Sequence, residues 1–457
     1  MERDAGLEIG AATLGLSTFA RDTQWSDIPE TVRHEARRSI LNIFATGLAG
    51  SGEPAIEKTL AALGPFSSDR RCRVTGRRER VDLLMAAYVN AMSANIFDFD
   101  DTHPNTIIHP TAPIAPALFA HAENAKTRPV DGQSLLRAFI IGAEIECRIG
   151  NAVSPSHYAR GWHITSTCGV FGAAAAIGVL KGFDVETFAW ALGNAAVQAC
   201  GLVEGLGTMS KSISVGNAAR NGVTSALLAA EGFSGPSCPI DGERGFLTVY
   251  SDTPNPDALF DGLGETWEIG KNTYKPYPVG VVLNPVMEAC IDLHAAQSFK
   301  VEDVVEVVLR GHPLLQQRAN RPDVTTGRES QVSAQHAVAI ALRRGRAGLL
   351  EFNDAAVAET LRDGIRPTIR FVDDESYDIE SVGLGVTTRT GETFQRDISD
   401  TRGGSKNPMS DGDIEKKLVA LAEYGGFNRD IQPLIDAIWS IESSSDAAAI
   451  MKLATLE

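Results

Sequence analysis

The stretch Leu83-Leu84-Met85-Ala86-Ala87-Tyr88-Val89-Asn90-Ala91-Met92 is apolar at nearly every position, which predicts a helix that is buried on all sides. Downstream, residues 114–120 have the same character and predict a second buried helix. Between the two lies Asp98-Phe99-Asp100-Asp101-Thr102-His103, followed closely by His109-Pro110. A buried carboxylate costs free energy unless it is paired or hydrogen-bonded. We therefore interpret this run of ionisable groups, placed where two buried helices meet, as a candidate functional site.

The first 270 residues follow the periodicity of helices. Ile40, Ile43, Phe44 and Gly47 recur at the spacing of one helix face. Residues 169–180 consist largely of small residues, which allow helices to pack closely. The alternating strands that a βαβ sheet requires are missing from this part of the sequence. The pattern therefore predicts a tightly packed helical bundle.

The pattern changes near Lys271. Residues 304–309 are a β-branched run that predicts a strand, and residues 381–395 predict a hairpin with its turn at residues 390–392. Helical patterning returns after Gly404. We therefore predict a mainly α protein with a large helical domain built from both chain ends and an inserted, smaller α+β lid domain. The predicted ranges are 1–270 and 405–457 for the helical domain and 271–404 for the α+β domain, with helices inside the latter at 333–343 and 354–362.

The composition excludes several classes of partner. Lys and Arg number 42 against 58 Asp and Glu, so the net charge of −16 disfavours nucleic acid or an anionic membrane as the main partner. Residues 1–5 lack the features of a signal peptide, and we see no run of about 18 apolar residues that would span a membrane. The six cysteines include no CxxC pair, which disfavours a structural metal site and is typical of the cytoplasm.

Three further segments carry side chains that could contact an anion. In residues 161–167, His163 precedes hydroxyl side chains that can cap a helix, and a helix N-terminus favours anions. Residues 205–212 fail as a phosphate loop because Ser210 stands where glycine is required, but Lys211 could still bind a carboxylate. In residues 275–280 two prolines would hold Lys275 and Tyr277 rigidly. Taken alone, the segments also fit a core histidine beside a capped helix, a solvated lysine and a stiff linker.

Two other classes of protein are considered. Asp98 to Thr102 fits the DxDxT signature of Mg²⁺-dependent, haloacid-dehalogenase-like phosphatases, in which the first Asp is the nucleophile. That signature follows a buried strand, whereas residues 89–97 here predict a helix, so we place this hypothesis last among the enzymes. A binding protein without enzymatic activity is the other alternative.

In their order along the chain, these segments resemble the 2-methylcitrate dehydratase family, also called MmgE/PrpD. The family includes 2-methylcitrate dehydratase, cis-aconitate decarboxylase and iminodisuccinate epimerase. The resemblance spans nearly the whole chain and rests on residues 41–50, 97–102, 109–110, 161–163, 207–211, 216–222, 275–278, 326–329 and 407–410. It implies a helical domain with a lid-like α+β domain, a homodimer, no metal or organic cofactor, and a small anionic carboxylate as the substrate.

The resemblance also implies roles for individual residues. It places Asp98, Thr102, His109, His163, Lys211 and Lys275 in the site, with Tyr277, His103 and His336 as further substrate-binding candidates. Three features depart from the family pattern. The spacing between Thr102 and His109 is about one residue longer than in the decarboxylases, His336 stands where many members have Tyr, and Asn284 stands where several have His. These departures leave the substrate and the reaction open.

The shared chemistry is proton transfer at a carbon beside a carboxylate. We expect Lys211 and Lys275 to stabilise the developing negative charge, and His163 or His109 to act as base, with Asp98 orienting an imidazole. Asp100 and Asp101 either cap a helix, pair with a cation or line the site. The favoured reaction is that of a hydratase or dehydratase, a carbon–oxygen lyase. A decarboxylase and an epimerase, or isomerase, are close alternatives.

Overall fold

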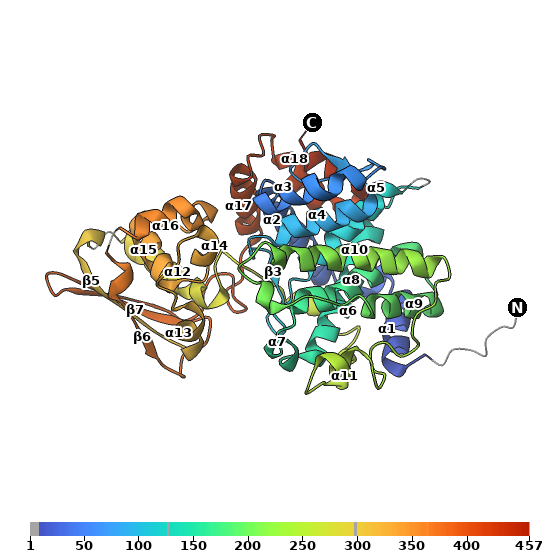
Figure 1. Cartoon of the computed structure of the whole chain (residues 1–457), viewed down its shortest axis with the longest axis horizontal. Helices are drawn as coiled ribbons and strands as arrows, with labels where there is room; N and C mark the ends of the chain where they lie inside the picture. Colours follow the sequence, from blue (N-terminus) through green and yellow to red (C-terminus); the bar gives the residue numbers. More distant parts are fainter. Residues whose placement is uncertain (1–8, 126–127, 297–298, 363, 457) are drawn as a thin grey trace, which may run out of the picture. The chain divides into compact units, whose positions relative to one another are not determined.

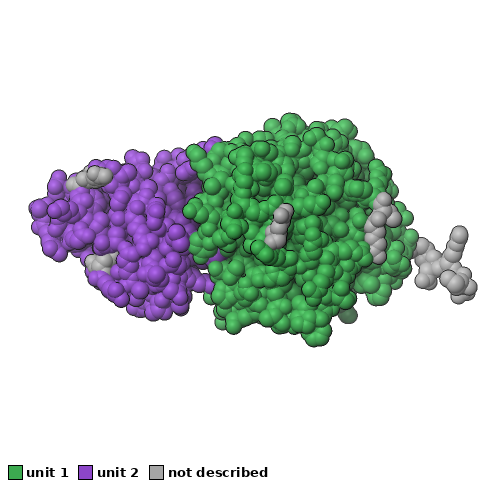
Figure 2. Space-filling view, turned by 90° about the horizontal axis from the view of Figure 1, so that it is seen from above, with its two compact units in different colours: residues 1–96, 100–272, 411–457 green, residues 97–99, 273–410 purple. Residues whose placement is uncertain are grey.

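The computed structural model describes residues 9–125, 128–296, 299–362 and 364–456. Residues 1–5, from which no signal peptide is expected, lie outside this part. The chain divides into two compact units, coloured separately in Figure 2. Unit 1 comprises residues 1–96, 100–272 and 411–457, and unit 2 comprises residues 97–99 and 273–410. The short segment 97–99 therefore belongs to a different unit from the acidic residues that follow it.

Unit 1 is built almost entirely of helices, so the expectation of a mainly α protein is confirmed. Helix α17 (Asp411–Tyr424) packs against α2 (Glu30–Gly50), so both ends of the chain contribute to one core (Figure 1). The other helices of eight or more residues in this unit are α1 (Ala11–Asp22), α3 (Pro54–Leu63), α4 (Leu83–Asn95), α5 (Thr111–Asn124), α6 (Gly132–Val153), α8 (Ile164–Lys181), α9 (Val185–Ala196), α10 (Ser210–Ala230) and α18 (Gln432–Trp439).

Small residues let three helices of unit 1 approach closely, as their sequence predicts. Helix α8 packs against both α6 and α10. A Cβ added to Gly142 of α6 would lie 2.7 Å from the backbone oxygen of Gly172 in α8. One added to Gly222 of α10 would lie 2.5 Å from Cβ of Ala173. His163 directly precedes α8 and Gly182 directly follows it, and the φ of 67° at Gly182 terminates the helix in the left-handed conformation.

Helix α8 has the length and apolar composition of a membrane span, unlike any other helix within the described residues. Of the window that meets this test, 89% is buried inside the protein. The core helix of a globular domain passes the same test, so the feature is weak evidence for a span. Helix α4, in turn, occupies the place where the phosphatase signature requires a strand.

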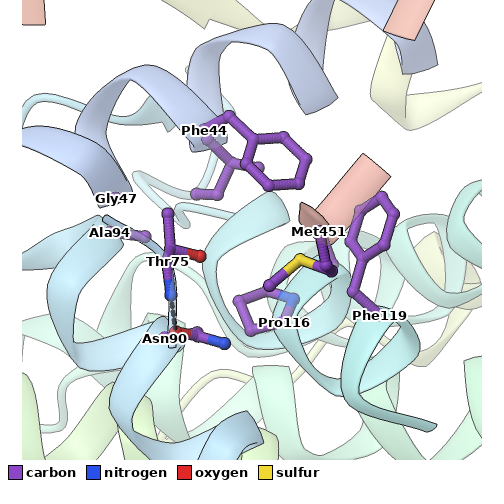
Figure 3. A pocket seen from close by; sticks show the side chains of 10 residues that line it. Phe44, Gly47, Thr75, Asn90, Ala94, Pro116, Phe119 and Met451 are labelled. Carbon is purple, nitrogen blue, oxygen red and sulfur yellow. Dashed lines mark hydrogen bonds between the residues drawn. The ribbon is translucent and has the colours of Figure 1, made fainter. Parts of the chain in front are cut away.

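A small cavity of about 20 Å³ lies inside unit 1, among α2, α4, α5 and the C-terminal helix α19 (Ile450–Leu453). Figure 3 shows that Phe44, Phe119 and Met451 face it. The backbone N–H of Thr75 donates to Asn90 Oδ1 at 2.9 Å along its edge. The cavity shares no residue with the candidate functional site described below, so it concerns packing alone.

Unit 2 contains a four-stranded sheet in the order β6-β5-β7-β8. Strand β5 (Val304–Gly311) runs parallel to β6 (Ile369–Asp373) and antiparallel to β7 (Val382–Thr388), which pairs with β8 (Thr393–Ile398). The predicted strand and hairpin are therefore present, and Gly391 between β7 and β8 has a φ of 82°. Helices α12 (Asn284–Ala295) and α15 (Ala334–Arg344) share an apolar core with the sheet. The remaining helices are α13 (Pro313–Ala319), α14 (Gly327–Ser330) and α16 (Asp354–Thr360).

Candidate active site

The acidic segment of unit 1 places a carboxylate beside an imidazole. Asp100 is fully buried, and its Oδ1 lies 3.2 Å from Nδ1 of His109. Asn95, at the end of α4, donates its amide to both carboxylate oxygens, at 3.1 and 2.8 Å. Burial opposes ionisation of Asp100, but the charges of His109 and Lys211 and the hydrogen bonds outweigh it, so its pKa is lowered. Asp100 is therefore a buried carboxylate that stays ionised.

His109 is held through both its ring and its backbone. Besides Asp100, its Nδ1 lies 2.9 Å from the backbone oxygen of Asp101, and its backbone N–H donates to Thr165 Oγ1 at 3.2 Å. Both neighbours of Nδ1 are acceptors, so the hydrogen-bond network assigns the proton of a neutral imidazole to Nδ1. Nε2 then carries the lone pair, or the second proton when the ring is charged.

His163 is presented in the same tautomer by a different partner. It is the residue before α8, is 4% exposed, and has its Nδ1 3.0 Å from Ser214 Oγ. The Ser214 hydroxyl donates to the backbone oxygen of Lys211 at 2.7 Å, so it accepts from His163. Nε2 of His163 is therefore also the atom that can exchange a proton with a substrate.

The two histidines meet at the N-terminus of α8. His163 precedes this helix, and Thr165 in its first turn accepts from the backbone of His109. A helix N-terminus carries partial positive charge, which favours an anionic ligand. Lys211, 5% exposed, lies in the first turn of α10 and is close enough to Asp100 to help lower its pKa.

Gly201 brings the starts of α8 and α10 together. Its backbone oxygen accepts from the N–H of His163 at 3.1 Å, and its φ is 136°. A Cβ at this position would collide with Ser166 Oγ and lie 3.2 Å from Cβ of Ser214. Only glycine lets this loop pass between the two helices, which holds His163 against Ser214.

Asp101 differs electrostatically from its neighbour Asp100. Its Oδ2 accepts from Thr111 Oγ1 at 2.6 Å and from Asn272 Nδ2 at 2.8 Å, and Oδ1 has no hydrogen-bond partner among the described residues. Burial and the charge of Asp100 raise the pKa of Asp101 to about 7. Glu146 of α6 is also fully buried, and burial together with Asp101 raises its pKa well above the ordinary value. Asp101 and Glu146 therefore take up protons more readily than an ordinary carboxyl group, whereas the adjacent Asp100 stays ionised.

His103 and Thr102 are buried in unit 1. His103 is fully enclosed, with Nδ1 2.7 Å from Thr106 Oγ1 and Nε2 2.8 Å from Glu268 Oε2. Despite its burial, Glu268 has a pKa lowered to about 2 by its bonds to His103 and Lys271. Both ring nitrogens of His103 thus contact protein groups.

The other predicted site residues lie in unit 2. Lys275 Nζ donates to the backbone oxygen of Asp98 at 2.7 Å and to its Oδ2 at 2.5 Å, and Asp98 has a φ of 55°. Tyr277 is half-buried, and burial raises its pKa to about 12. His336 is fully buried between Thr360 Oγ1 and the backbone oxygen of Glu351, and burial lowers its pKa to about 4.

The structure thus groups Asp100, His109, His163 and Lys211 in unit 1, and Asp98 with Lys275 in unit 2. The carboxylate that contacts the imidazole of His109 is that of Asp100, whereas the sequence-based hypothesis expects Asp98 to orient an imidazole. The sequence analysis did not identify Asn95, Ser214 or Glu146. Ser214 had one usable signal: it lies three residues after Lys211, on the same face of a predicted helix. Within the residues that the structure describes, no group of three His, Cys, Asp or Glu side chains could hold a metal ion.

Comparison with known proteins identifies the family of the chain. Residues 15–259 match the model of the MmgE/PrpD N-terminal domain, and residues 277–441 match that of the MmgE/PrpD C-terminal domain. The cis-aconitate decarboxylase-like protein oryM of Aspergillus oryzae is 27% identical, over 97% of each chain. The cis-aconitate decarboxylase of Homo sapiens is 26% identical, over 96% of this chain and 94% of its own. That of Mus musculus is 25% identical, over 93% and 90%. Both domain models match in their proper order, so this chain belongs to the MmgE/PrpD family.

Proposed function

We propose that this chain is a lyase that removes CO₂ from a small unsaturated tricarboxylate of the cis-aconitate type. The observation that carries the proposal is the pair His109 and His163, each with Nδ1 bonded to the protein, at the N-terminus of α8. Relatives named as cis-aconitate decarboxylases align with more than nine-tenths of the chain. A sequence identity of about one quarter supports the class of reaction more strongly than it supports any particular substrate.

The proposed reaction requires one proton donor. The bond to the carboxylate on the methylene carbon breaks, and its electron pair forms a new double bond with the central carbon. CO₂ leaves as this bond breaks, and the CH carbon of the former double bond takes up one proton. His109 suits this donor role because the ionised Asp100 stabilises the charged imidazole, which delivers the proton from Nε2. Solvent then restores the proton.

Two cationic features would stabilise the charge that develops on the carboxylates of the substrate. One is Lys211, and the other is the N-terminus of α8. Thr102, His103, Lys275, Tyr277 and His336 stay predictions as substrate-binding residues, and Asp98 stays one as a catalytic residue.

Dehydration is the second candidate reaction. Decarboxylation needs one proton donor, whereas the site presents two imidazoles. In a dehydratase, His163 would remove a proton beside a carboxylate, and His109 would protonate the leaving hydroxyl. This pairing is the observation that keeps the dehydratase under consideration.

Proton NMR in D₂O distinguishes the candidates. The purified protein is incubated with cis-aconitate, trans-aconitate, citrate, 2-methylcitrate and iminodisuccinate in separate samples. We expect cis-aconitate to lose CO₂ and to gain one deuterium. Loss or gain of water would identify the hydratase or dehydratase, and deuterium exchange at an unchanged skeleton would identify the epimerase. No change in any sample would contradict the proposal. EDTA should leave the rate unchanged, because every step is assigned to protein groups.

We also propose that the chain forms a homodimer in the cytoplasm. Resemblance to the family supports the dimer, and the absence of a CxxC pair from the sequence supports the compartment. Light scattering on the purified protein should give twice the mass of the 48.8 kDa chain.

A further inference from the structure

A basic pocket lies in unit 1, among the β1–β2 hairpin, the end of α5 and the C-terminal segment. Its volume is about 520 Å³, within the range of about 300–1,000 Å³ that is usual for ligand sites. Two carboxylates, Glu123 and Asp446, line it. So do six cationic side chains, Arg70, Arg71, Arg73, Arg80, Arg128 and Lys452. This excess of positive charge is unexpected in a chain of net charge −16.

Both carboxylates of the pocket are already engaged. Glu123 binds Arg73 through its guanidinium at 2.5 Å and its backbone N–H at 2.7 Å. Asp446 accepts from the backbone of Ala448 at 3.1 Å. Arg71 pairs with Asp69 at 2.9 Å.

No ion pair involving the remaining four cations is found within the described part of the chain. They are Arg70, Arg80, Arg128 and Lys452, and all four are exposed. The pocket therefore holds several guanidinium groups that form no ion pair with a described carboxylate, although Glu123 and Asp131 act on Arg80 and Arg128 at longer range.

The hairpin places two of the arginines directly opposite each other. Strand β1 (Cys72–Arg73) pairs antiparallel with β2 (Arg80–Val81), and Arg73 faces Arg80 across the pair. Like charges at such positions destabilise a sheet. Glu123 forms an ion pair with Arg73 but acts on Arg80 only at longer range, so one carboxylate faces two guanidinium groups. An anion in the pocket would remove this repulsion.

The other lining residues indicate which anion fits. They are alanines and a proline, Ala122, Ala125, Pro129, Ala448 and Ala449, so no aromatic ring is available to stack on a base. Guanidinium groups present paired donors that match the oxygens of a phosphate. We propose that this pocket binds a small oligophosphate, either inorganic triphosphate or the phosphate chain of a nucleotide. It shares no residue with the candidate active site, so it is a second ligand site of unit 1.

Isothermal titration calorimetry with sodium triphosphate tests the proposal. The ionic strength is held constant with NaCl, because unspecific attraction of anions is screened by salt. We expect saturable binding to the unchanged chain, and a loss of about tenfold or more in affinity in Arg70→Ser/Arg80→Ser, since each guanidinium contributes charged hydrogen bonds. Arg78→Ser is the matched control, because Arg78 is exposed in the same hairpin but does not line the pocket. It should bind as the unchanged chain does.

A parallel titration with ATP identifies the source of the phosphates. Equal affinities for ATP and triphosphate would show that the phosphate chain suffices, and tighter binding of ATP would indicate a nucleotide. Absence of saturable binding, equal affinity in the double variant, or binding of citrate that depends equally on Arg70 and Arg80 would overturn the proposal. A change of mass in the double variant would also overturn it, because the pocket would then be a subunit contact. Circular dichroism confirms that each variant is folded.

Discussion

Oδ1 of Asp100 lies 3.2 Å from Nδ1 of His109, and the two side chains are 0% and 8% exposed. A buried carboxylate in this position orients the imidazole and stabilises its protonated form. The adjacent Asp101 is equally buried but accepts its hydrogen bonds from a hydroxyl and an amide. Two neighbouring carboxyl groups therefore have different electrostatic roles.

Asp100→Asn tests the first of these roles. The amide keeps the shape of the side chain but removes the charge that stabilises protonated His109, so we expect kcat to fall about 100-fold. Activity should also be lost at a lower pH than in the unchanged chain, because the imidazole then loses its proton more easily. A pH profile of kcat measures both effects, and an unchanged profile would argue against the pairing.

Asp101→Asn should change stability in a pH-dependent manner. The pKa of Asp101 is about 7 in the folded chain and about 4 when unfolded. Its contribution to stability is therefore complete below about pH 4 and is lost as the pH rises through 7. The variant cannot ionise, so its melting temperature relative to the unchanged chain should increase from pH 5 to pH 8.

Asp100→Asn is the matched control for this experiment. The pKa of Asp100 is lowered in the folded chain, so its contribution to stability is present above the unfolded pKa and is lost as the pH falls. The charge of Asp100 is only the second cause of the raised pKa of Asp101, after burial, so the melting temperature of Asp100→Asn relative to the unchanged chain should rise less between pH 5 and pH 8 than that of Asp101→Asn. Parallel melting curves for the two variants would refute the different electrostatic roles.

Ser214→Ala should impair the enzyme without unfolding it. The hydroxyl accepts from Nδ1 of His163, so its loss removes the group that selects the tautomer. We expect kcat to fall about fivefold, with a smaller change in KM, since one neutral hydrogen bond contributes about 1 kcal/mol. Ser212→Ala is the control, because the Ser212 hydroxyl, in the same helix, has no hydrogen-bond partner within the described residues. Equal kinetics of the two variants would contradict the role of Ser214.

Gly47→Ala should stabilise unit 1 by about 1 kcal/mol, because alanine is the better helix former. Gly47 lies inside α2 and lines the small cavity of Figure 3, where an added Cβ would meet Thr75 Cγ2 at an ordinary 3.5 Å. Gly50→Ala in the same helix is the control. Its Cβ would collide with the backbone oxygen of Ser93, so it should destabilise. Urea unfolding measures the free energy of unfolding of both variants. Destabilisation by Gly47→Ala would show that the space beside Gly47 is already filled.

The sequence predicts the elements of this fold better than their partners. Helix α4 and strands β5, β7 and β8 follow from local apolar and β-branched patterns. Strand β6 also alternates and could have been identified by the same rule. The assignment of residues 97–99 to unit 2 could not have been predicted from the sequence. It depends on long-range contacts: the Gln331 amide donates to the backbone oxygen of Phe97, which lies 234 residues away along the chain.

The same distinction applies to the candidate site. His109, His163 and Lys211 were identified by their residue types, since imidazole and ammonium groups beside capping hydroxyls suit an anionic substrate. The contacts of Asn95 with Asp100 and of Ser214 with His163 depend on how α4, α8 and α10 pack, and no short pattern encodes such packing. The sequence therefore predicts the candidate reactive groups, while the structure was needed to show what orients them.

The most direct test of the central claim is the turnover of cis-aconitate by His109→Gln and His163→Gln. His121→Gln is the control, because His121 lies on α5 and its Nδ1 has no hydrogen-bond partner within the described chain. We predict that the two site variants lose about 100-fold or more in kcat while the control keeps full activity and all three melt as the unchanged chain does. Full turnover in both site variants would contradict proton transfer by these imidazoles.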